Sequence, residues 1–174
     1  MERDDQSNVE QESDGYRELF ETMCAKARET FLKDGAQEPL LLVITRLGMG
    51  LVHINFDPDM PREPVAREIG ERIRRTAIET AGETVLDEPL ALILAAEAWM
   101  VEYDKDEPQE TLLLPPRLHP RRQEILQVLL RSTYLSLCRT WKIERYGDRV
   151  ALGPANELSG EGMECVWDLI LTGE

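Results

Sequence analysis

The sequence has little of what marks secreted, membrane-spanning or disulfide-rich proteins. Its three cysteines, Cys24, Cys138 and Cys165, are odd in number and widely spaced, which predicts reduced thiols in a cytoplasmic protein. The longest uninterrupted apolar run, residues 90–96, is far shorter than the roughly 20 residues that cross a bilayer. Residues 1–5 are acidic, unlike the basic start of a signal peptide. We therefore expect no membrane partner.

Positive charge is also scarce. The chain has 34 Asp and Glu against 20 Lys and Arg, which gives a net charge of −14 at pH 7. Nucleic acids are bound through basic surfaces, so this charge disfavours nucleic acid as a partner. The arginines of residues 62–75 mostly follow a glutamate by four positions, as Arg67 follows Glu63, which predicts surface ion pairs on a helix.

Motifs for metal binding or covalent catalysis are missing. The two histidines, His53 and His119, have no second ligand at helical or strand spacing. Residues 47–50 are rich in glycine, but they lack the lysine of a phosphate-binding loop and lead into a predicted strand. We expect no metal and no cofactor, interpret the cysteines as buried structural thiols, and favour a protein that is not an enzyme.

What is present fits an ordinary globular protein. A chain of 174 residues is long enough to bury a substantial core in one domain. Residues 1–13 are polar and acidic, which predicts a disordered tail, and residues 14–174 are expected to form a single α+β domain. Apolar residues at helical spacing predict helices at 14–33, ended by Gly35, and at 62–81, where Gly70 would allow close packing on a sheet.

Residues 90–102 are the most informative stretch. Both alternating rows are apolar, which is typical of a strand buried on both faces in the middle of a sheet. Residues 124–131 fit either a strand or a helix, and we favour a strand paired with 134–145. Residues 103–122 contain several prolines and predict a long irregular segment.

The remaining patterns complete the predicted fold. It is α+β, with a mixed or mostly antiparallel sheet of five to six strands and two helices on one face, in the order α-β-β-α-β-β-β-β. The other predicted segments are a hairpin of residues 40–46 and 51–56, a strand at 149–153, a polar loop at 154–162, and a last apolar piece at 163–171 that favours a strand over a helix.

Glu97 interrupts the apolar pattern of the central strand. A carboxylate inside such a strand must pair, become protonated or face a cavity, because an unpaired buried charge costs several kcal/mol. The sequence leaves open a structural ion pair and a ligand-binding carboxylate with a raised pKa. Under the second interpretation, Glu97 meets Arg121 or Arg122, and the binding residues are Glu97, His119, Arg121 and Arg122.

Short motifs add a resemblance to a known group. They are Phe31, Asp34-Gly35, Pro39, Glu97-Ala98-Trp99, Pro120, Arg122 and Glu124. Together they resemble small uncharacterised bacterial and phage proteins over about residues 16–153. The resemblance implies a compact α+β fold and no particular chemistry.

Two functions follow as expectations. Two helices on one side leave the other face of the central strand to be covered, so the leading interpretation is a binding or assembly protein that forms a homodimer through the sheet face opposite the helices. The alternative is a small enzyme, or a binding site for a small anionic ligand, built on Glu97 with residues 117–122.

Overall fold

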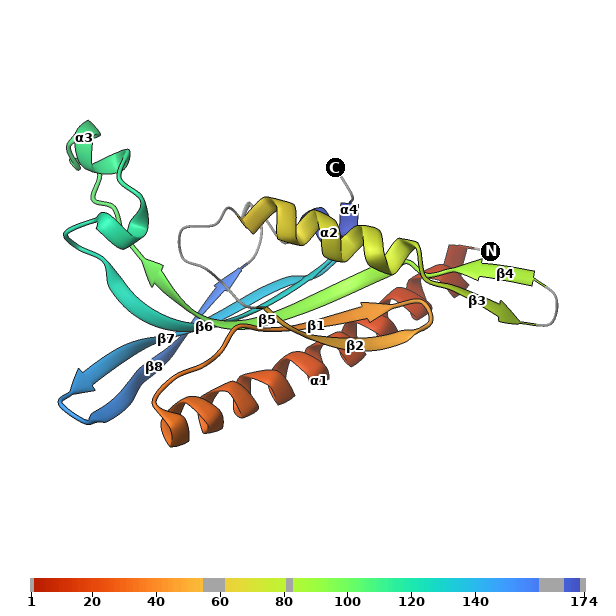
Figure 1. Cartoon of the computed structure of the whole chain (residues 1–174), viewed down its shortest axis with the longest axis horizontal. Coiled ribbons are helices and arrows are strands. Elements are labelled where there is room, and N and C mark those ends of the chain that lie inside the picture. Colours follow the sequence, from red (N-terminus) through yellow and green to blue (C-terminus); the bar gives the residue numbers. More distant parts are fainter. Residues whose placement is uncertain (1, 55–61, 81–82, 160–167, 173–174) are drawn as a thin grey trace.

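An antiparallel sheet forms the centre of the computed structural model, which describes residues 2–54, 62–80, 83–159 and 168–172. The sheet has six strands in the order β2-β1-β5-β6-β7-β8 (Figure 1), so the predicted α+β class is confirmed. The strands are β1 (Leu40–Thr45), β2 (Gly48–His53), β5 (Pro89–Met100), β6 (Gln123–Ser132), β7 (Ser136–Tyr146) and β8 (Arg149–Ser159).

Strand β5 is buried on both faces, as its two apolar rows predict. It pairs with β1 on one side and β6 on the other. Ile93 and Ala95 belong to the core on one face of the sheet, and Leu92 and Leu94 to the core on the opposite face. The pairing of β6 with β7 also confirms the strand expected at 124–131.

The helices lie on opposite faces of the sheet, so the expectation of two helices on one face is wrong (Figure 1). Helix α1 (Glu2–Asp34) covers one face, where Phe20 and Phe31 join the core of Ile93. Helix α2 (Arg62–Arg74) and the short α4 (Asp168–Thr172) cover the other face. The physical reason is that both rows of β5 are apolar, and each row needs its own cover.

Helix α1 begins at Glu2 and therefore runs through residues 2–13, where the sequence predicts a disordered tail. Acidic residues in the first turns of a helix are favourable, because the helix dipole is positive at that end. At the other end, Gly35 has φ 75° and its N–H donates to the carbonyl of Phe31 at 2.8 Å, as predicted. The single domain over 14–174 stays a prediction.

The second helix ends earlier than predicted, at Arg74. It is followed by a separate two-stranded hairpin, β3 (Ala77–Thr80) and β4 (Glu83–Leu86), which projects beyond the main sheet (Figure 1). Alternating β-branched residues at 76, 78 and 80 favour a strand over a helix, which explains the difference. The β1–β2 turn also differs, because its glycines belong to strand β2.

The C-terminal part differs from the prediction in two places. Strand β8 continues through Pro154, where a polar loop was expected, because an edge strand tolerates proline. Residues 168–171 of the expected last strand belong to helix α4, and residues 163–167 lie outside the described residues. Arg74 Nη2 donates to the carbonyls of Ile170 and Leu171, each at 2.8 Å, which satisfies groups that a helix end leaves unpaired.

The proline-rich segment after β5, residues 103–122, forms a projecting arm. It is largely irregular, as its prolines predict. It contains only the short helix α3 (Gln109–Leu112) and a 3-10 turn, η1 (Pro116–Leu118) (Figure 1). No helix within the described ranges combines the length and apolar character needed to cross a membrane.

Candidate functional site

Glu97 lies on the α1 side of the sheet, in the same row of β5 as Ile93 and Ala95. Its Oε1 accepts a hydrogen bond from the backbone N–H of Gln37 at 2.6 Å, and its Oε2 accepts one from Arg145 at 3.1 Å. The half-buried carboxylate therefore has a charged partner, which the apolar surroundings of the strand require.

The predicted partner of Glu97 is wrong, because the ion pair uses Arg145 of β7 and neither Arg121 nor Arg122. Both predicted arginines have other partners: Arg122 lies over the ring of Trp99, 5.2 Å from its centre, and Arg121 binds Asp104 and Glu107. Alternation places Arg145 on the α1 side of β7, but the sequence alone gives no register to connect it with Glu97.

Arg145 joins two carboxylates to the end of α1. Its guanidinium donates to both oxygens of Glu124, at 2.6 and 2.9 Å, and to Glu97. It also donates to the carbonyl of Gly35 at 3.1 Å and lies 5.8 Å from the ring centre of Phe31. Sequence reasoning missed the role of Arg145 in this cluster.

The two carboxyl groups have opposite pKa shifts. Burial raises the pKa of Glu97, although the Gln37 N–H and Arg145 oppose this shift by favouring the ionised form. Hydrogen bonds from Arg145 lower the pKa of Glu124. The negative charge of Glu124 also raises the pKa of Glu97, so the two pKa values are moved apart.

His119 belongs to a different cluster, which folds the projecting arm. Its side chain is fully buried, its Nδ1 accepts the backbone N–H of Arg121 at 3.1 Å, and its Nε2 lies 3.4 Å from Glu107. Arg121 also binds the carboxylates of Asp104 and Glu107, at 2.6 and 2.7 Å, and Tyr103 contacts His119 edge-on. These contacts order the loop and do not include Glu97.

Only one of the four predicted binding residues lines a pocket beside the arm. This pocket has a volume of about 520 Å³, and Glu97 and Arg117 are among its lining residues, whereas His119, Arg121 and Arg122 are not. Arg122 instead stacks over the ring of Trp99, 5.2 Å from its centre. The four residues therefore do not converge on one site.

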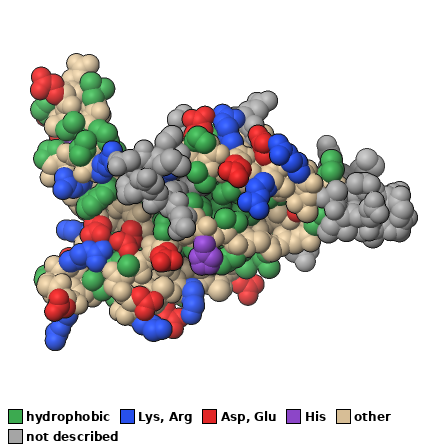
Figure 2. All heavy atoms as spheres, viewed as in Figure 1, with side chains coloured by type: hydrophobic (Ala, Val, Ile, Leu, Met, Phe, Trp, Pro, Cys, Tyr) green, Lys and Arg blue, Asp and Glu red, His purple; other side chains and the backbone are tan. Residues whose placement is uncertain are grey.

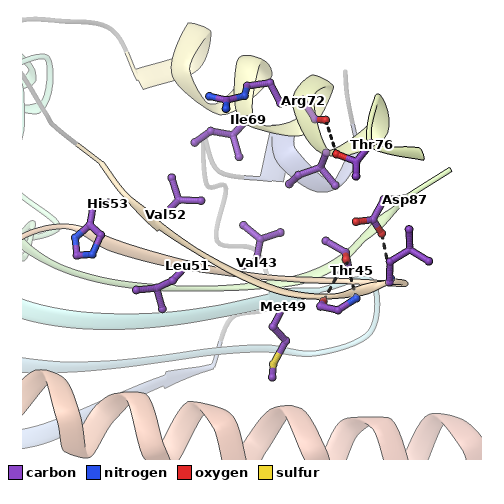
Figure 3. Close-up of a pocket in the computed structure, with 14 residues that line it drawn as sticks. Val43, Thr45, Met49, Leu51, Val52, His53, Ile69, Arg72, Thr76 and Asp87 are labelled. Carbon is purple, nitrogen blue, oxygen red and sulfur yellow. Dashed lines mark hydrogen bonds between the residues drawn. The ribbon is translucent and has the colours of Figure 1, made fainter. Parts of the chain in front are cut away.

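A larger groove of about 670 Å³ lies between α2 and the β1–β2 hairpin (Figure 3). Val43 and Val52 rise from the hairpin toward Ile69 of α2, and Gly50 is opposite Val43. A Cβ atom placed on Gly50 would meet nothing within 4 Å, so the groove is open there. Figure 2 shows hydrophobic side chains at the surface between the charged face of α2 and the hairpin. The sequence pattern of residues 47–50 does not indicate this groove.

The described cysteines and carboxylates suit structural roles. Cys24 and Cys138 are buried, and burial raises the pKa of Cys24 to about 12, far from that of a reactive thiolate. Cys165 lies outside the described residues. In the part of the chain that the structure describes, no group of three or more His, Cys, Asp and Glu is placed to hold a metal ion.

Comparisons of the chain with models of known families, with curated proteins and with solved structures find no match. The resemblance to small bacterial and phage proteins therefore stays a prediction. The function has to be inferred from the geometry of the chain itself.

Proposed function

We propose that the protein is a non-enzymatic assembly protein that forms a homodimer through the free edge of β2. The surface expected from the sequence, the sheet face opposite the helices, is covered by helices of the same chain. Because helices cover both faces of β5, we place self-association at the edge of the sheet and not on one of its faces.

The observation that carries the proposal is the character of β2. This strand is the last in the sheet, and its sequence GMGLVH has no charged residue and no proline. Met49 is 65% exposed and Leu51 is 54% exposed. Proteins usually protect an edge strand with charges, proline or a bulge, because its unpaired N–H and C=O groups can bind another strand.

The opposite edge of the sheet has the protection that β2 lacks. Strand β8 contains Pro154 and Glu157, and its register with β7 shifts between Trp141 and Ile143. A sheet with one open edge and one protected edge can pair with a second copy only once. Such pairing favours a closed dimer over an open fibre.

Antiparallel pairing of two β2 strands about Gly50 brings apolar residues together. Met49 of one copy then lies opposite Leu51 of the other, on the α1 side of the sheet. Cross-strand apolar pairs each contribute about 0.2–1 kcal/mol in addition to the backbone hydrogen bonds. The glycines at 48 and 50 place no side chain on the other side to obstruct the approach.

Analytical ultracentrifugation over a concentration series tests this proposal. The wild-type chain is expected to form a dimer, and Leu51→Lys to weaken it by about tenfold or more, because each copy then brings a positive charge to an apolar contact. Leu51 is exposed, so the variant should keep its fold, which circular dichroism would check.

The matched control is Leu158→Lys, the same substitution at a half-exposed leucine of β8. This control should leave the dimer unchanged. A wild-type chain that is monomeric at every concentration would refute the proposal, and so would equal weakening by both variants.

A further inference from the structure

A smaller cavity lies at the C-terminal end of α1, where the chain turns toward β1 (Figure 1). Its volume is about 330 Å³, at the lower end of the range for small-molecule sites. Asp34, Gln37 and Glu38 supply polar side chains to its lining. The lining does not include Met49 or Leu51, whose contact forms the proposed dimer, so a ligand in this cavity does not depend on that dimer.

The two carboxylates of the cavity are available to a ligand. Asp34 and Glu38 are exposed, and neither side chain has a hydrogen bond or an ion pair with a residue that the structure describes. No lysine or arginine is among the described residues that line the cavity. Arg145 donates to the nearby carbonyl of Gly35, but it is not part of the lining. The cavity therefore has a negative potential, which attracts a cation.

The position of Asp34 also favours a cation. Asp34 is the last residue of α1, a helix of 33 residues. The C-terminal end of a helix carries partial negative charge from its unpaired carbonyls, so a carboxylate there is unfavourable. Lys33 is in the same turn and offsets part of this effect, but it does not line the cavity. A cation bound at Asp34 would interact favourably with the carboxylate and with the helix end.

Gln37 adds a buried acceptor without a donor. This residue is only 8% exposed, and its Nε2 donates to the carbonyl of Glu38 at 2.7 Å. Its Oε1 has no hydrogen-bond partner among the described residues. Because an unpaired buried acceptor is unfavourable, an N–H group of a ligand would be stabilising here.

Much of the remaining lining is apolar. Met23 and Ala27 come from α1, Leu40 from β1 and Ala95 from β5. A ligand that matches the cavity offers hydrogen-bond donors and positive charge at one end and a carbon chain at the other. A primary ammonium group has three N–H donors and no acceptor, and it is charged at neutral pH.

We propose that this cavity binds a small primary alkylamine in its ammonium form. The ammonium group lies among the carboxylates of Asp34 and Glu38 and donates to Gln37 Oε1. The alkyl chain packs against Met23 and Leu40. One charged group with three donors thus satisfies three acceptors that have no donor in the chain.

Isothermal titration of the full chain at pH 7 with three probes tests these requirements. Butylamine has the charge, the N–H donors and the alkyl chain. 1-Butanol has the chain without the charge, and tetramethylammonium has the charge without N–H donors. Butylamine is expected to bind at least about tenfold more tightly than either of the others. No saturable butylamine binding up to about 10 mM, or equal binding of the three probes, would overturn the proposal.

Two variants test the carboxylates. Asp34→Asn and Glu38→Gln each remove one charge with little change in size, and each should weaken butylamine binding by about three- to tenfold. Both positions are exposed, so both variants should fold. Asp14→Asn is the matched control, because it makes the same substitution at an exposed position of the same helix, and it should leave binding unchanged. Equal weakening by Asp34→Asn and Asp14→Asn would reveal an effect of net charge alone and would contradict the site.

A further pair of variants separates this cavity from the pocket beside Glu97, because Gln37 lines both. Gln37→Met removes the unpaired acceptor and should weaken butylamine binding severalfold. Arg117→Ala changes a residue that lines only the pocket beside Glu97, and it should leave binding unchanged. If Gln37→Met does not fold, the Asp34 and Glu38 variants still decide the question. Binding that responds to Arg117→Ala and not to Asp34→Asn would place the amine elsewhere and overturn the proposal.

Discussion

One guanidinium group decides the electrostatics at the end of α1. Arg145 contacts Glu97, Glu124 and the carbonyl of Gly35, so it links two strands to the helix end. Positive charge near the C-terminal end of a helix is favourable, because the last carbonyls are unpaired. The cluster therefore has a structural role. Its two carboxyl groups, those of Glu97 and Glu124, respond differently to pH.

Glu97 and Glu124 should change stability with pH in opposite directions. The pKa of Glu97 is raised above 4.5, so its contribution is complete at low pH and is lost as pH rises from 4.5 through the raised value. The pKa of Glu124 is lowered, so its contribution is present above 4.5 and is lost as pH falls through the lowered value.

Urea unfolding at a series of pH values measures both effects. Relative to Glu97→Gln, the wild-type free energy of unfolding should fall as pH rises above about 4.5. Relative to Glu124→Gln, the wild-type free energy of unfolding should rise as the pH rises through the acidic range below about 4.5. The same direction of change in both comparisons would contradict the assigned pKa shifts.

The packing of α2 on α4 depends on Gly70. A Cβ atom on Gly70 would lie 3.1 Å from both the Cα and the carbonyl oxygen of Ile170, and 2.9 Å from Nη1 of Arg74. The sequence predicts a close approach at this glycine, but to a sheet. In the structure the neighbour is the short helix α4, whose carbonyls Arg74 binds.

Gly70→Val should therefore loosen α4 and lower the free energy of unfolding by about 1–3 kcal/mol, as overpacking does. Hydrogen exchange at Ile170 should become faster. The control, Glu68→Val, puts the same side chain on an exposed position of α2 and should cost only the difference in helix propensity, below about 1 kcal/mol. Equal losses in the two variants would show that the contact with α4 is unimportant.

Long elements with a clear period were predictable, and short ones were not. The two apolar rows of β5 and the alternation of β7 indicate strands without help from the rest of the chain. Helix α4 has five residues and depends on Arg74, so its local sequence cannot specify it. The β3–β4 hairpin was likewise hidden, because residues 77–81 also continue the helical pattern of α2.

The candidate site was predictable only in part, for a related reason. An acidic residue in an apolar strand shows that a partner is needed, and Glu97 has one. The identity of that partner depends on how β5, β6 and β7 pair and on the reach of the arginine side chain, because Arg145 lies four residues beyond Trp141, the β7 residue level with Glu97. Register follows from packing across the sheet and is not written in any single segment.

The arrangement of layers explains where the chain can bind another copy. Helix α1 covers one face of the sheet and α2 with α4 cover the other (Figure 1). The apolar rows that first indicated self-association are therefore satisfied within one chain. The edge of β2 remains exposed, and it lacks charge in a protein whose net charge is −14.

This combination predicts how salt affects the proposed dimer. Two copies with a charge of −14 each repel one another, whereas the β2 contact contains no ion pair that salt could weaken. The screening length falls from about 30 Å at 0.01 M salt to about 8 Å at 0.15 M. Raising the salt over this range should therefore tighten the dimer severalfold, as sedimentation equilibrium would measure. A dimer that weakens with salt would have to be held by ion pairs, which the edge of β2 cannot supply, and association would then have to use another surface.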